Sequence, residues 1–156
     1  MEGRCACGAV AYRVNANPIV VHCCHCRACQ RETGSAFAIN ALVETAQVEL
    51  LNGTPERIVT PSESGKGQTI VRCPLCHVAL WTHYAGAADR VAFIRAGTLD
   101  DPGSVTPDVH IFTRSKLPWV SLPPGVPAFE IFYSRADVPR IYGERGTLRW
   151  QAARAG

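Results

Sequence analysis

Hydrophobic and polar residues alternate in short runs along the chain, and Gly, Pro and Asn separate these runs. The runs are rich in β-branched and aromatic residues, which is typical of strands with one buried face. The pattern predicts strands over residues 9–14, 19–23, 37–43, 48–51, 57–60, 69–73, 78–84 and 90–96, with a turn at "NGTP". Short strands at this spacing favour a mainly β single domain of short antiparallel strands.

Helical signals are few. Residues 26–33 are expected to form a turn or two of helix, because Gly34 follows and glycine commonly ends a helix. Between residues 102 and 127, six prolines prevent long regular elements. Residues 134–156 are rich in Arg and predict a C-terminal tail or terminal helix, which leaves residues 1–133 as the domain proper.

Composition excludes several classes of protein. Of the 156 residues 47% are hydrophobic and 19% charged, as in an ordinary globular protein. The net charge of +3 is spread along the chain, so the dense basic stripe of a nucleic-acid binder is missing. No apolar run approaches the roughly 20 residues of a membrane span. The first residues do not resemble a secretory signal, and we therefore expect a cytoplasmic protein.

The eight cysteines carry the chemistry of this sequence. A reducing cytosol disfavours disulfides, so metal binding or catalysis is the better explanation for so many thiols. All but one of the cysteines fall into three clusters: Cys5 and Cys7; Cys24, Cys26 and Cys29; Cys73 and Cys76.

The first and last clusters complement one another. Two cysteines separated by two residues, as in "CPLC", reach one ion from a tight turn. In "CACG" the backbone must leave strand geometry to aim both thiols at one ion, and Gly8 makes that turn feasible. Cys5, Cys7, Cys73 and Cys76 are therefore expected to form a closed, structural four-thiolate zinc site.

The middle cluster offers three thiolates, one fewer than tetrahedral zinc requires. The fourth position is either open, as in catalytic zinc sites, or filled by a further protein ligand, and spacing leaves both readings open. The candidates for that ligand are His22, His25 and Cys23. Cys23 is expected to point away from Cys24, because consecutive strand residues face opposite sides.

An open site of this kind would suit carbon–sulfur chemistry. Zinc held by three thiolates favours soft ligands, so a substrate thiol is a natural fourth ligand and would bind deprotonated. Such a thiolate is a nucleophile for a small carbonyl compound such as an aldehyde.

The segments "CACGAVAYRV", "CCHCRACQRETGSAFA", "CPLCHVALW", "GTLDDP" and "HIFTRSKLPW" resemble, in this order, the glutathione-dependent formaldehyde-activating enzyme family, also called the centromere protein V family. The resemblance covers residues 3–129. It implies a mainly β fold with zinc-ribbon-like knuckles and two zinc ions per chain. It also implies that Cys24, Cys26 and Cys29 hold a catalytic ion at which glutathione adds to formaldehyde, a carbon–sulfur lyase reaction in either direction.

Two features depart from the family pattern. Family members usually carry Gly after the "CPxC" pair, where this chain has His77, so we expect backbone strain there. Cys23 is an additional thiol beside the middle cluster, and its role is open.

Substrate contacts are less well defined by the sequence. Arg31 is the leading candidate to bind a glutathione carboxylate, ahead of Arg27 and Arg114, since guanidinium pairs with carboxylate bidentately. Trp119 is expected to be a core residue and His110 a structural histidine. The alternative function is a non-catalytic zinc-stabilised module that binds protein or nucleic acid, which a fourth protein ligand in the middle cluster would favour.

Overall fold

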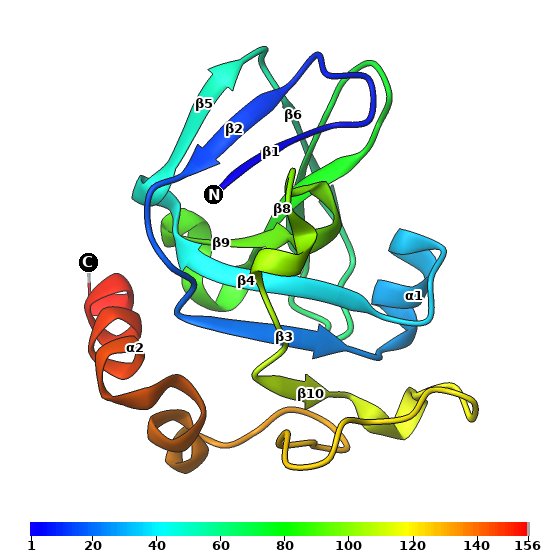
Figure 1. The fold of residues 1–156 in the computed structure, drawn as a ribbon, viewed down its shortest axis with the longest axis vertical. Coiled ribbons are helices and arrows are strands. Elements are labelled where there is room, and N and C mark those ends of the chain that lie inside the picture. The colour runs from blue at the N-terminus through cyan, green and yellow to red at the C-terminus, as the bar shows by residue number, and fades with distance from the viewer. Residues whose placement is uncertain (156) are drawn as a thin grey trace.

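The computed structural model describes residues 1–155 and shows two β-sheets with a helical segment at the C-terminal end that is kinked at Gly143 (Figure 1). The prediction of a mainly β single domain is confirmed. A three-stranded sheet has the order β1-β2-β5 and is antiparallel throughout. Its strands are β1 (Glu2–Arg4), β2 (Ala11–Val14) and β5 (Val48–Asn52).

A seven-stranded sheet has the order β10-β3-β4-β9-β8-β7-β6. Its neighbouring strands are antiparallel, except that β10 pairs with β3 in parallel. The strands are β3 (Val20–Cys24), β4 (Ala38–Glu44), β6 (Glu56–Thr60), β7 (Gln68–Arg72), β8 (Ala79–Tyr84), β9 (Val91–Arg95) and β10 (Val109–Ile111).

All eight predicted strands are present with ends shifted by no more than two residues, whereas β1 and β10 were missed. Both missed strands have only three residues, too few for alternation to show, and β10 lies in the proline-rich stretch. The "NGTP" turn joins β5 to β6, which belong to different sheets, so it does not form a hairpin.

The two α-helices begin and end at recognisable residues. Helix α1 (Arg27–Thr33) starts after Cys26, whose side chain caps its first turn, and ends at Gly34 in the left-handed conformation, as predicted. Helix α2 (Val138–Ala155) follows a turn capped by Ser134 and Asp137. No helix within residues 1–155 combines the length and the apolar character needed to cross a membrane.

The core has two parts, one on each face of the large sheet, because side chains alternate along every strand. One part fills the space between the two sheets and includes Tyr12 and Ile94. The other lies under the C-terminal segment, where Tyr142 of α2 is buried and bonds to the Tyr133 hydroxyl at 2.6 Å. Helix α2 therefore packs on the large sheet, and a division of the chain at residue 133 stays a prediction.

Candidate metal centres and the cavity beside them

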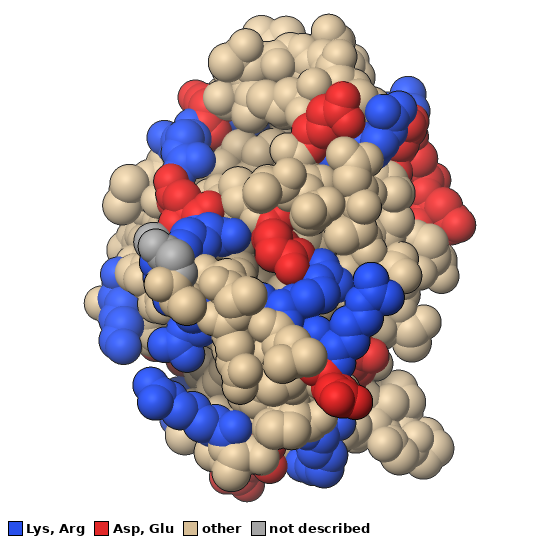
Figure 2. Space-filling model, turned by 90° about the vertical axis from the view of Figure 1, so that its left-hand side faces the viewer, with Lys and Arg blue, Asp and Glu red and all other residues tan. Residues whose placement is uncertain are grey.

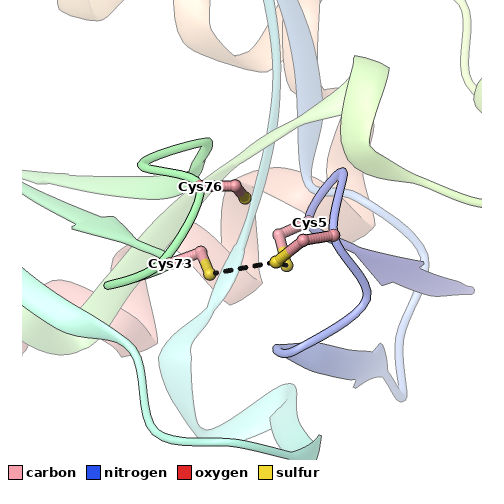
Figure 3. Close-up of side chains that lie close together, drawn as sticks. Cys5, Cys73 and Cys76 are labelled. Atoms are coloured by element: carbon pink, nitrogen blue, oxygen red, sulfur yellow. Dashed lines mark hydrogen bonds between the residues drawn. The ribbon is translucent and has the colours of Figure 1, made fainter.

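The four outer cysteines meet between two turns. Cys5 and Cys7 lie just after β1, and Cys73 and Cys76 lie on the turn between β7 and β8, with their sulfur atoms directed toward Cys5 (Figure 3). The Sγ–Sγ distances are 3.5 Å between Cys5 and Cys7 and 3.7 Å between Cys7 and Cys73. Zn–S bonds of about 2.3 Å give a tetrahedron with S···S edges of about 3.8 Å. The arrangement therefore fits a four-thiolate zinc site.

Backbone N–H groups favour the thiolate form of this cluster. The amide of Val10 donates to Cys5 Sγ at 3.3 Å, and the amide of Leu75 donates to Cys73 Sγ at 3.4 Å. Hydrogen bonding from the Val78 amide lowers the pKa of Cys76 to about 6. Deprotonated thiols are the form that binds zinc.

His77 has the backbone strain that the sequence predicted. Its φ is +59°, a left-handed conformation that costs a side chain with a Cβ atom more than it costs glycine. Its ring is exposed, and Nδ1 lies 3.4 Å from the carboxylate of Glu56.

The middle cluster is formed where β3 passes into α1. Cys24 ends the strand, Cys26 caps the helix and Cys29 lies in its first turn, and all three are buried. Their Sγ atoms lie within 4.8 Å of one another. Hydrogen bonds with the Cys24 and Cys29 thiols, and with backbone amides, lower the pKa of Cys26 to about 3. Among the three thiols, Cys26 is therefore the one whose surroundings favour the thiolate.

No fourth protein ligand joins this cluster among the residues that the structure describes. No further Cys, His, Asp or Glu ligand atom lies within 4.8 Å of all three thiols. His22 bonds through Nε2 to the Tyr133 hydroxyl at 2.6 Å. Cys23 and His25 gather instead with His110 in a separate group.

A cavity of 310 Å³ opens beside the three thiols, which form part of its wall. Much of the remaining wall is apolar. It includes aromatic rings from segments that are far apart in the sequence. These rings belong to His22, Tyr84, Phe93, Phe112 and Phe132. A small substrate in this cavity would lie against the cluster.

Arg95 is a cavity residue that sequence reasoning missed. It ends β9, is 6% exposed, and donates to Asn40 Oδ1 at 2.7 Å and Thr82 Oγ1 at 3.3 Å. Within residues 1–155 no carboxylate forms a salt bridge with it. The hydrogen bond with Cys24 lowers the pKa of Cys29, whereas Cys26 and burial raise it to about 11, and the charge of Arg95 acts against that rise. One feature of the sequence does connect Arg95 with the cavity. It lies two residues after Phe93, so both side chains are on the same face of the strand.

The other predicted contacts do not line the cavity. Arg27 and Arg31 are exposed on α1 and do not line the cavity, and Arg114 pairs with Glu63 at 3.4 Å. Lys66 and Arg95 are the cations of the cavity wall. Arg31 as a glutathione contact stays a prediction.

The expectation for Trp119 was wrong, because its side chain is 73% exposed. The prolines around it hold the segment in a surface loop, where an apolar ring cannot reach the core.

Charged side chains of both signs are mixed on the face shown in Figure 2, with basic groups more frequent in its lower half. Acidic groups lie among them, so no continuous basic patch covers this face.

Comparison with known proteins assigns the chain to a family. No curated protein matches it. The crystal structure of a Rhodobacter sphaeroides protein matches with a TM-score of 0.50 and 20% identity, covering 69% of this chain and 92% of that one, which supports the fold. The model of the glutathione-dependent formaldehyde-activating enzyme family (GFA) matches residues 1–115. With both cysteine clusters inside the matched region, this protein belongs to the GFA family.

Proposed function

We propose that the protein is a zinc-dependent carbon–sulfur lyase-type enzyme that adds a thiol, glutathione or a similar compound, to formaldehyde or a related small electrophile. The observation that carries this proposal is a buried three-thiol cluster without a fourth protein ligand in the described chain, facing a cavity of 310 Å³. Cys24, Cys26 and Cys29 would hold the catalytic ion, and Cys5, Cys7, Cys73 and Cys76 a structural one.

The metal would activate the thiol, and the chain would position the substrates and balance the charge. A zinc ion bound by the three thiols would bind the substrate thiol as its thiolate. The aromatic wall would keep the small aldehyde beside the sulfur and exclude water. Arg95, close to the cluster, would balance the excess negative charge of the thiolates.

The overall reaction is balanced without any redox partner. In the forward direction a bond forms between the substrate sulfur and the aldehyde carbon. The proton lost by the thiol ends on the former carbonyl oxygen. The reverse reaction returns that proton to the thiol and releases the aldehyde.

The test is the rate of adduct formation from glutathione and formaldehyde, with the zinc-loaded full chain compared with the uncatalysed reaction. We expect a clear acceleration that Cys26→Ser abolishes. Ala36→Ser is the matched control, because it also adds a hydroxyl at a buried position but lies outside the cavity wall. An unaccelerated reaction would overturn the proposal for this substrate pair, and equal loss in both variants would remove the assigned role of Cys26.

A further inference from the structure

The one cysteine outside the two clusters lies in a third group of ligating side chains. Cys23 Sγ lies 3.6 Å from His25 Nε2, and His25 Nε2 lies 3.0 Å from His110 Nδ1. The three atoms lie within 4.8 Å of one another, and the three residues are 2%, 0% and 5% exposed. We propose that Cys23, His25 and His110 form a third metal site, for a zinc-class divalent transition-metal ion.

The topology places this group behind the proposed catalytic cluster. Cys23 and Cys24 are consecutive in β3, so their side chains point to opposite faces of the large sheet. His110 of β10 is the register partner of Cys23, which puts both on the same face. His25 follows the end of β3, and its amide bonds to the Ile111 carbonyl at 3.0 Å. The backbone therefore holds the three side chains of the group close together.

The distances fit a tetrahedral ion. Zn–S bonds of about 2.3 Å and Zn–N bonds of about 2.0–2.1 Å give an S···N edge of about 3.6 Å and an N···N edge of about 3.3 Å. The observed 3.6 Å equals the first edge, and the observed 3.0 Å is slightly shorter than the second. The ion would draw the two imidazoles apart by a few tenths of an ångström. One thiolate and two imidazoles suit zinc and similar borderline ions.

The inner nitrogens of these two rings, His25 Nε2 and His110 Nδ1, have only each other and the Cys23 thiol as partners within the described chain. Both can therefore turn a lone pair toward an ion, while the outer nitrogens, His25 Nδ1 and His110 Nε2, would carry the ring protons. His83 is an instructive contrast, since its Nδ1 faces the Val91 carbonyl at 2.8 Å and its Nε2 accepts from the Trp81 indole at 3.2 Å.

An ion here would fasten β10 to β3. The β10 strand is three residues long and pairs with β3 on one side. On its other side the His110 amide donates to the Pro127 carbonyl at 2.8 Å, and the Phe129 amide donates to the His110 carbonyl at 2.9 Å. Coordination by His110 would hold this strand, and the loop that follows it, against the strand that carries Cys24. The third metal site would thus support the proposed catalytic cluster structurally, from the opposite face of the large sheet.

The test counts metal ions. The full chain, purified from zinc-supplemented culture and equilibrated with buffered free Zn²⁺, is analysed by native mass spectrometry. We expect three ions in the wild type and two in Cys23→Ala, which removes the thiol and leaves the His25–His110 hydrogen bond intact. His110→Asn should also hold two ions, and the matched control His83→Asn, a change of the same kind at a buried histidine outside the group, should hold three.

The proposal is overturned if Cys23→Ala holds as many ions as the wild type, because the other two clusters are the same in both proteins. A wild type with two ions and a variant with one would instead count against metal binding at one of those other clusters. A Co²⁺-loaded sample supplies a second readout, since the visible spectrum of a site with one sulfur and two nitrogen ligands should disappear in Cys23→Ala. Circular dichroism identifies any variant that fails to fold, and Cys23→Ala still tests the site if His110→Asn is lost in this way.

Discussion

Arg95 is the one guanidinium among the residues that line the cavity. Three thiolates around a doubly charged ion leave a net negative charge, and the buried Arg95 lies where its charge favours the thiolate of Cys29. A buried cation without a carboxylate partner in the described chain would be costly on its own. Its position is explained if it compensates the charge of the cluster.

Replacing Arg95 by Gln should therefore weaken zinc binding at the middle cluster by roughly 10- to 100-fold, as is typical for a supporting residue around a metal site. Loss of the positive charge raises the pKa of the thiols, so zinc loading should require a higher pH. Zinc competition with a chelating dye across a pH series measures both effects. The zinc affinity of Arg95→Lys, which keeps the charge, should lie between those of the wild type and Arg95→Gln. An unchanged affinity in Arg95→Gln would contradict the charge argument.

His77 provides a second prediction at this scale. Glycine tolerates the observed φ of +59°, so His77→Gly should raise the free energy of unfolding by about 1 kcal/mol, measured by denaturant titration of the zinc-loaded protein. His77→Ala removes the same ring but keeps the Cβ atom, and it should give no such gain. Equal effects of the two variants would assign the change to the side chain instead of the backbone.

At the scale of elements, helix α2 is attached to the large sheet partly by charge. Arg149 of α2 donates two hydrogen bonds to the carboxylate of Glu44 at the end of β4, one of them from Nε at 2.8 Å. The two side chains are 21% and 23% exposed, so solvent screens the pair only in part. This contact and the buried Tyr142 hold the C-terminal segment beside the strands that carry the cavity.

The Glu44–Arg149 pair should make stability depend on pH in the acid range. The hydrogen bonds from Arg149 lower the pKa of Glu44 in the folded state. The stabilisation is therefore complete above the unfolded-state pKa of about 4.3 and is lost as the pH falls through the lower folded-state value. Glu44→Gln should cost about 1 kcal/mol at pH 7 and flatten this dependence.

Thermal melts of both proteins from pH 7 to pH 3 measure the effect. Glu2→Gln serves as control, because Glu2 pairs with Arg13 at an exposed site where solvent screening leaves little stabilisation to lose. An equal change in both variants would contradict a special role for the α2 contact.

The elements also show which parts of the structure could be predicted from sequence. Short alternating runs predicted eight strands because that signal is local. The spacing of the cysteines and the four ligands that zinc requires predicted both clusters, although one of them joins distant parts of the chain. The parallel pairing of β10 with β3 could not be predicted, since a three-residue strand has no pattern and its partner lies far away in sequence. The cavity depends on the same long-range packing, which is why Arg95 and Phe132 were missed while Arg31 was favoured for its position beside Cys29.

At the scale of the whole molecule, the four-cysteine cluster joins two turns that are far apart in the chain. Cys7 and Cys73 are separated by 66 residues, and linking them links the small sheet to the far half of the large one. Because the unfolded chain cannot preform such a site, the free energy of zinc binding there would contribute to folding.

Cys7→Ser should therefore lower the melting temperature strongly, although Cys7 is exposed and a serine would otherwise cost little there. Val59→Ser, at a position that is 80% exposed, is the matched control and should change the melting temperature only slightly. Chelator should bring the wild type down toward the Cys7→Ser value. A Cys7→Ser protein as stable as the control would contradict zinc binding at this cluster.

Phe132 contributes to the cavity wall from outside the region that the family model matches, residues 1–115. The thiols that would hold metal and one of the rings that would touch substrate are thus encoded in different parts of the chain. Substitutions in the later segment can reshape the cavity without moving a single sulfur atom. The later segment can therefore alter the shape of the cavity while the thiol clusters stay as they are.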